Sequence, residues 1–246
     1  MTDALLLVLA GIGGGLAGSI AGLASAVSYP ALLAAGLGPV QANVTNTVAL
    51  VFSSLGSTVG AAPELRGQLP AVRRLGLAAV AGGATGAGLL LITDPDTFEK
   101  LAPWLIAGAS VAILARPRPR HAVAAGDEHP GTLVAGVFAV GIYGGYFGAA
   151  AGVVLLALLL ASINETIARA SALRNAILGI ANGTAAIAFA LLADVDWSSM
   201  APLAIGLLAG ARTGPVIVRR SDARVLRTLI GIAGLAVALK LAVDAY

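Results

Sequence analysis

Arg174 lies deep inside an apolar stretch of this sequence, where a charged side chain requires a chemical explanation. The stretch covers residues 166–193, and Arg174 lies roughly 12 Å from its start at a helical rise of about 1.5 Å per residue. The 12 Asp and Glu residues all fall in loops or near stretch ends, so no carboxylate lies at a depth to neutralise it. Charges at such depth cost about 2.5–3.5 kcal/mol on insertion scales and usually serve a function. A planar guanidinium suits an oxyanion, so we predict that Arg174 binds one.

Polar side chains line one face of each of two apolar stretches, 40–62 and 166–193. At about 100° per residue, these faces comprise Asn43, Asn46, Thr47, Ser54 and Ser57 in the first stretch and Ser171, Asn175 and Asn182 in the second. Such residues either join helices, through hydrogen bonds worth about 1 kcal/mol each, or bind a substrate. Because Arg174 borders the second face, we predict that Thr45, Asn46, Ser171 and Asn175 also contact the substrate.

Glycines cluster near the middle of two long apolar stretches, 4–36 and 131–163. Each stretch exceeds the roughly 20 residues that a straight helix needs to cross a bilayer. We predict that each is broken at or near its glycines, as a re-entrant hairpin or as two short crossings, next to a cavity. Free amides at such a break bind anions, so the predicted site includes Gly13, Gly14, Gly15, Gly144 and Gly145. Close helix packing is the alternative role for these glycines.

The sequence predicts no cofactor, no metal, no nucleic-acid partner and no enzymatic activity. Gly13-x-Gly15-x-x-Gly18 matches the dinucleotide fingerprint, but no strand–helix–strand unit surrounds it. Cysteine is absent, and both histidines, His121 and His129, lie in one polar loop, which leaves no Cys or His for chemistry inside an apolar stretch. The net charge of +3 comes from arginines at the ends of apolar stretches, a pattern that orients membrane proteins.

The elements that must position these residues are apolar helices. The chain has 246 residues, of which 58% are hydrophobic and only 11% charged, whereas soluble domains carry about 25% charge. A chain of this composition is expected to be an all-α integral membrane protein of the cell (plasma or inner) membrane with about eight apolar segments. These segments cover residues 4–36, 40–62, 71–92, 101–115, 131–163, 166–193, 200–218 and 225–243.

The order of the segments predicts two similar halves, with residues 1–115 as the first repeat, 116–130 as a cytoplasmic linker and 131–246 as the second repeat. In the first half the loop near 63–74 is basic and the loop near 94–99 is acidic. The corresponding loops of the second half carry the opposite charges, with an acidic loop near 194–196 and a basic loop near 219–227. Basic loops stay in the cytoplasm, so the charge reversal predicts an inverted-topology repeat, which is common in secondary transporters.

The order of these motifs resembles the TauE/SafE family of membrane transporters. The residues that carry the resemblance are Gly13-Gly14-Gly15, Ala42-Asn43-Val44-Thr45-Asn46, Gly144-Gly145 with Gly148 and Gly152, Ala168-Arg169-Ala170-Ser171, and Val195-Asp196-Trp197. The resemblance implies export of sulfite, a sulfonate or a related organosulfur anion. The partners expected on this basis are a small anion and membrane lipid, and the sequence leaves open a homodimer.

Three other functions are alternatives to a transporter that works by alternating access. An intramembrane enzyme would need a His, a Cys or paired carboxylates inside an apolar segment, and the sequence has none there. A structural membrane subunit would not need two Gly-rich broken segments. An uncoupled anion channel remains an alternative, because its site would use the same residue types.

Overall fold

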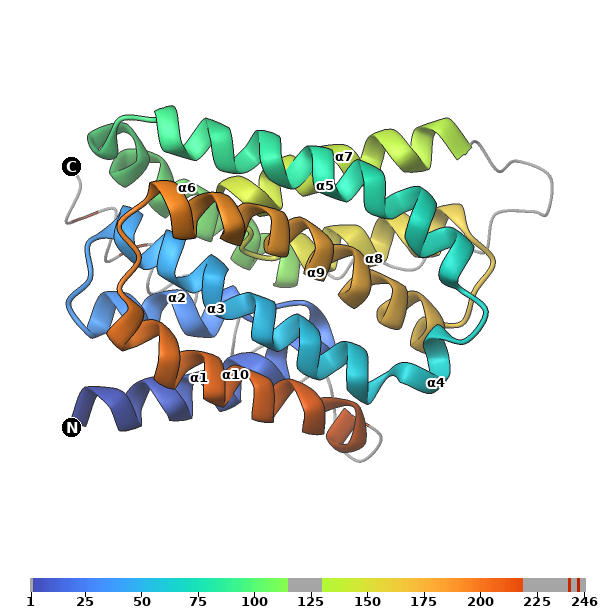
Figure 1. Ribbon diagram of the computed structural model, residues 1–246, viewed down its shortest axis with the longest axis horizontal. Helices are drawn as coiled ribbons and strands as arrows, with labels where there is room; N and C mark the ends of the chain where they lie inside the picture. The colour runs from blue at the N-terminus through green and yellow to red at the C-terminus, as the bar shows by residue number, and fades with distance from the viewer. Residues whose placement is uncertain (1, 115–129, 219–238, 240–242, 244–246) are drawn as a thin grey trace.

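The computed structural model describes residues 2–114 and 130–218, together with residues 239 and 243. These described ranges fold as ten α-helices and contain no strand (Figure 1). The all-α prediction is therefore confirmed for this part of the chain. The helices are α1 (Thr2–Ala21), α2 (Ser25–Ala34), α3 (Pro39–Gly60), α4 (Ala62–Leu65), α5 (Leu69–Ile92), α6 (Pro95–Leu114), α7 (Pro130–Tyr146), α8 (Ala151–Ser162), α9 (Ile167–Leu192) and α10 (Trp197–Val218).

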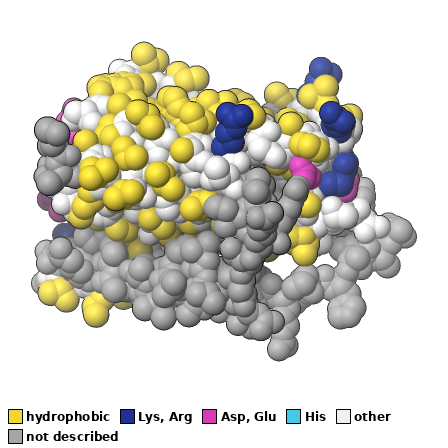
Figure 2. Space-filling view, turned by 90° about the horizontal axis from the view of Figure 1, so that it is seen from below, with side chains coloured by type: hydrophobic (Ala, Val, Ile, Leu, Met, Phe, Trp, Pro, Cys, Tyr) yellow, Lys and Arg dark blue, Asp and Glu magenta, His cyan; other side chains and the backbone are white. Residues whose placement is uncertain are grey.

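Two of the described helices, α5 and α9, have both the length and the apolar composition to cross a membrane. They contain 24 and 26 residues, and at about 1.5 Å per residue both exceed a hydrocarbon core of about 30 Å. Large apolar side chains point outward along several helices, and Leu77, Leu191 and Ile205 are more than half exposed. In Figure 2, hydrophobic side chains predominate on the described part of the surface, and the charged side chains lie mostly near its two ends. Such a surface is suited to lipid.

Helices of the first half pair with helices of the second half through glycines. On α1, a Cβ at Gly11 would lie 2.5 Å from the carbonyl oxygen of Leu203 on α10. On α7, a Cβ at Gly145 would lie 2.5 Å from the carbonyl oxygen of Gly83 on α5. Only glycine permits backbones to approach this closely. The first helix of each half therefore packs against the third long helix of the other half.

Each long apolar stretch contains two helices, joined at a glycine in the left-handed backbone conformation. Helix α1 ends at Ala21 and is followed by Gly22 with φ +75°, and α7 ends at Tyr146, before Gly148 with φ +78°. Glycine adopts this conformation without steric cost and commonly ends helices. A Cβ at Gly152 of α8 would lie 2.5 Å from the Cα of Gly22, so the turns of the two halves touch.

The glycines predicted to offer free amides lie elsewhere in these segments. Gly13, Gly14 and Gly15 lie within the continuous helix α1, and Gly144 and Gly145 lie within α7. Their amides belong to the hydrogen-bond ladders of these helices. The prediction of free amides at these five glycines is therefore wrong. For Gly15 and Gly145 the alternative role is the correct one, since each meets the backbone of a partner helix, α10 or α5.

Helices α7 and α9 run in the opposite direction to α1 and α3 (Figure 1). In Figure 1, α1 and α3 run from left to right, whereas α7 and α9 run from right to left. Hydrogen bonds place α3 and α9 antiparallel: Gln41, near the start of α3, bonds Asp194 after the end of α9, and Gln68, after α4, bonds the carbonyl of Arg169 near the start of α9. Residues 116–129 of the predicted linker 116–130 lie outside the described residues, and Pro130 begins α7. Most of the last apolar stretch, 225–243, also lies outside the described residues.

Candidate substrate cavity

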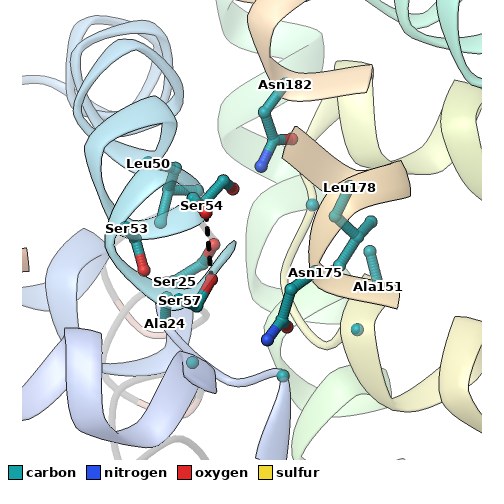
Figure 3. A pocket seen from close by; sticks show the side chains of 14 residues that line it. Ala24, Ser25, Leu50, Ser53, Ser54, Ser57, Ala151, Asn175, Leu178 and Asn182 are labelled. Carbon is teal, nitrogen blue, oxygen red and sulfur yellow. Dashed lines mark hydrogen bonds between the residues drawn. The ribbon is translucent and has the colours of Figure 1, made fainter. Parts of the chain in front are cut away.

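A cavity of about 50 Å³ lies where the two helix breaks face α3 and α9 (Figure 3). One buried water needs about 10–15 Å³ of such space, so the cavity has room for a few waters or one small ion. The lining residues come from both halves of the chain. They are Gly18, Gly22, Ala24, Ser25, Leu50, Ser53, Ser54, Ser57, Gly148, Ala151, Gly152, Asn175, Leu178 and Asn182.

The polar groups that line this cavity are hydroxyls and side-chain amides, and none of its lining residues carries a charge. In Figure 3 the serines of α3 lie on one side, and Asn175 and Asn182 of α9 extend toward them from the other. The hydroxyl of Ser57 donates to the carbonyl oxygen of Ser54, 3.1 Å away. Hydroxyls and amides offer donors without a full charge, which suits a small ligand that accepts hydrogen bonds and is later released.

Arg174 lies behind the wall of the cavity. Its side chain is fully buried, and its Nη2 donates to the carbonyl oxygens of Gly18 and Ser19 over 3.2 and 2.9 Å. These carbonyls belong to the last turn of α1, the negative end of the helix dipole, where a cation is stabilised. These two carbonyls supply negative potential to the guanidinium, and the interpretation that Arg174 itself contacts a bound anion stays a prediction.

Asn175 is the one residue of the predicted contact set that lines the cavity. Its Oδ1 accepts hydrogen bonds from Arg174, over 3.1 Å from Nε and 2.7 Å from Nη2. Figure 3 shows the amide nitrogen of Asn175 on the side that faces α3. Asn175 thus connects the buried cation with the space that a ligand would occupy.

Thr45, Asn46 and Ser171 lie outside the cavity lining. Thr45 accepts a hydrogen bond from the backbone N–H of Asp196, which precedes α10. Asn46 accepts one from the hydroxyl of Ser28 on α2, while its Nδ2 is buried without a hydrogen-bond partner. Thr45 and Asn46 thus join α3 to the segment before α10 and to α2, which is the alternative role that their residue types allow.

An aromatic cluster, formed by Tyr29, Phe98, Tyr146 and Phe147, fills the space near the start of α3. The ring centroids of Tyr29 and Phe147 lie 5.3 Å apart, and that of Phe98 lies 5.9 and 6.0 Å from those of Tyr146 and Phe147. Asn43, in the first turns of α3, donates to the carbonyl of Tyr146 over 2.8 Å. The cavity contacts α3 only from Leu50 onward. Within the described part of the chain, the aromatic cluster therefore lies near the start of α3, and the cavity lies along the later part of that helix.

Several residues that line the cavity were not among the predicted contacts. The sequence contains a pattern that points to some of these residues but not to others. Ser54 and Asn182 lie on the two polar faces but were not selected, because serine and asparagine also serve as helix joints. Gly22 and Gly148 belong to the two glycine clusters, yet nothing in the sequence separates a glycine at a turn from one inside a helix. Ser25 had no signal, since it lies in an otherwise apolar stretch.

Comparisons with a family model and with individual proteins both indicate a membrane transporter. The family described as Sulfite exporter TauE/SafE matches residues 7–241. The probable membrane transporter protein YfcA of Escherichia coli strain K12 is 26% identical over 239 residues, which cover 93% of this chain and 85% of that protein. The probable membrane transporter protein ORF9 of a Sinorhizobium species is 26% identical over 236 residues, which cover 92% of this chain and 87% of that protein. No solved structure matches. Because the family match spans nearly the whole chain, this protein belongs to the sulfite exporter TauE/SafE family.

Proposed function

We propose that this protein is a secondary transporter that exports a small oxyanion, such as sulfite or a sulfonate, across the cell membrane. The observation that carries the proposal is the cavity between the two helix breaks, lined by serine hydroxyls and asparagine amides. The relatives named as probable membrane transporters support a transporter rather than an enzyme. The family name supports sulfite as the first substrate to test.

An inverted repeat of the two halves fits this function. Gly22 and Gly148 occupy corresponding places, since each follows the first helix of its half and each has a positive φ. Helix α1 packs against α10, and α7 packs against α5. If α1 corresponds to α7 and α5 corresponds to α10, these two pairings are equivalent. Opposite directions of α3 and α9 further support the inversion. In such transporters the site lies between the repeats, and access alternates as one repeat moves against the other.

The position of the cavity supports loading from the cytoplasm. Leu50, Ser54 and Ser57 lie in the later part of α3, toward the loop that carries Arg66. Basic loops remain cytoplasmic, so the cavity lies on the cytoplasmic side and the aromatic cluster on the outer side. An anion that enters here would leave once the aromatic cluster separates.

Flux measurements on purified protein in proteoliposomes test the proposal. We expect radiolabelled sulfite to leave loaded vesicles along its gradient, with saturable initial rates and stimulation by unlabelled sulfite on the opposite side. Vesicles with the Asn175→Leu variant, which removes an amide from the cavity, serve as the control and should show little flux. Flux without saturation or trans-stimulation would indicate a channel. Sulfite and sulfonate flux no faster than from protein-free vesicles would refute the proposed substrate class.

A further inference from the structure

We infer that Arg174 is a positioning residue that never touches the substrate, and that it orients the Asn175 amide so that its NH2 group faces the cavity. The inference rests on the proposed function, because it explains how that cavity would select an anion. It assigns the two neighbours different tasks: Asn175 meets the ligand, and Arg174 determines which end of the amide is presented.

The donor chemistry of arginine determines the orientation of the amide. A guanidinium has only N–H donors, so the atom of Asn175 that faces it must be the acceptor, Oδ1. Two donors of Arg174, Nε at 3.1 Å and Nη2 at 2.7 Å, converge on this one oxygen. A flipped amide would place its own N–H groups against those of the guanidinium. The NH2 group of Asn175 is therefore directed away from Arg174, toward α3 and the cavity (Figure 3).

The guanidinium is itself held in place by the other half of the protein. Nη2 of Arg174 donates to the carbonyl oxygens of Gly18 and Ser19, in the last turn of α1. Gly18 also lines the cavity. The end of α1, the Arg174 guanidinium and the Asn175 amide therefore form one connected series that ends at the ligand space. A shift of α1 relative to α9 would break this series and release the amide.

The same arrangement gives the cavity a preference for anions although its lining is neutral. An amide whose oxygen accepts from a cation is polarised, and its N–H groups become stronger donors. The charge of Arg174 acts across a buried region of low dielectric, where its attraction for an anion is stronger than in water. Because the anion contacts the amide and not the guanidinium, it escapes the tight bidentate pairing that arginine forms with oxyanions. The expected ligand is a small oxyanion that accepts several hydrogen bonds.

A matched pair of variants, Arg174→Gln and Arg174→Met, separates orientation from charge. Both variants remove the charge and have similar length, but only Gln retains an N–H group that can donate to Oδ1 of Asn175. For sulfite binding to purified protein in nanodiscs, we expect Arg174→Met to raise the Kd at least about tenfold, a loss of about 1.4 kcal/mol. Arg174→Gln should bind at least about threefold more tightly than Arg174→Met. Equal Kd values for wild type and Arg174→Met would overturn the inference.

The side-chain NMR signals of asparagine give a readout that a purely structural role would not move. In protein labelled with ¹⁵N-asparagine, the NH2 signals of Asn175 are assigned by their absence in Asn175→Gln. Sulfite should shift these signals in wild type and in Arg174→Lys, which retains a cationic donor, and it should not shift them in Arg174→Met.

If Arg174→Met does not fold, sulfite binding is compared between Arg174→Lys and Asn175→Asp to test the inference. The carboxylate of Asn175→Asp offers no donor, so this variant must lose sulfite binding while Arg174→Lys retains it. Sulfite binding to Asn175→Asp at wild-type strength would contradict the inference, whereas absence of binding to wild type would instead refute sulfite as the substrate.

Discussion

The backbone N–H of Asp196 donates a hydrogen bond to Oγ1 of Thr45 over 3.0 Å, and this bond joins the start of α10 to α3 of the other half. Thr45 is fully buried. Both residues belong to the motifs through which the sequence resembles its family, and the structure brings these motifs together outside the cavity. Thr45 therefore contributes to stability in this conformation, since it joins α10 to α3, the helix whose later part lines the cavity.

Replacement of Thr45 tests this assignment. Thr45→Val keeps the shape of the side chain but removes the acceptor, which leaves the N–H of Asp196 without this bond. We expect a loss of about 1 kcal/mol in the free energy of unfolding and an unchanged Kd for sulfite. Thr47→Val is the control, because Thr47 donates only to Asn43 in its own helix and its loss should be smaller. A sulfite Kd raised tenfold in Thr45→Val would return Thr45 to the substrate site.

Asp196 is expected to make the stability of α10 depend on pH. Hydrogen bonds lower the pKa of its carboxyl below the ordinary 3.8, with the largest effect from the Ser198 side chain and further effects from Ser199, which burial opposes in part. A carboxyl with a lowered folded-state pKa stabilises the protein above its unfolded pKa, and this contribution is lost as pH falls through the folded pKa. Thermal unfolding of wild type and Asp196→Asn between pH 7 and pH 3 checks this.

The wild type should lose its advantage over Asp196→Asn only as the pH falls below 3.8. Asp196→Ala also removes the acceptor for the N–H of Ser198, 2.9 Å away, at the start of α10. Loss of such a cap costs about 0.5–2 kcal/mol. A difference between wild type and Asp196→Asn that is constant across this pH range would mean that the charge of Asp196 contributes nothing.

Contact between the two helix breaks should make Gly152 intolerant of any side chain. A Cβ at Gly152 would lie 2.5 Å from the Cα and 2.7 Å from the carbonyl oxygen of Gly22, and backbone on both sides cannot easily retreat. We expect Gly152→Ala to lower the unfolding temperature and to abolish sulfite flux. Gly88→Ala is the matched control, because nothing lies within 4 Å of its Cβ position and Ala favours a helix interior by roughly 0.5–1 kcal/mol. Similar unfolding temperatures for the two variants would show that the breaks are separated.

Single cysteines test the predicted topology, because the chain contains no native cysteine. We expect Leu69→Cys, an exposed position at the start of α5, to react with an impermeant maleimide only after cells are permeabilised. Asp94→Cys and Asp194→Cys, which follow the C-terminal ends of α5 and α9, should react in intact cells. The reason is that basic loops stay in the cytoplasm, and Leu69 lies close to Arg66 in the basic loop. Equal labelling of all three variants in intact cells would contradict the proposed inverted repeat.

Labelling of a cysteine placed in the cavity tests from which side of the membrane the cavity is open. Ser54 lines the cavity. In the proposed orientation, a small thiol reagent added outside inside-out membrane vesicles should label Ser54→Cys, whereas the same reagent added outside intact cells should not. Phe147→Ala removes a ring from the aromatic cluster, which should allow labelling from outside. Labelling of Ser54→Cys from outside without this second change would indicate an open channel.

The helical, membrane character of this protein could be predicted from composition and charge pattern alone. A continuous apolar stretch of about 20 residues favours a helix in a bilayer, because a helix satisfies every backbone polar group within the same segment. The positions of Arg66, Asp94 and Asp194 likewise indicated which ends of the helices lie together. These features are local, because the hydropathy or charge of each residue is enough to predict them.

The identity of each polar partner was decided only by the tertiary structure. A buried guanidinium needs negative potential, but a bound anion, a carboxylate and the carbonyls at a helix end all supply it. Nothing near Arg174 in the sequence indicates that Gly18 and Ser19, in the other half of the chain, are its acceptors. Glycines posed the same difficulty: Gly15 and Gly22 are identical in type, yet packing against α10 keeps the first in a helix, while contact with Gly152 accompanies the turn at the second. Which polar group is satisfied, and by what, depends on which helices meet, and that is a property of the folded chain.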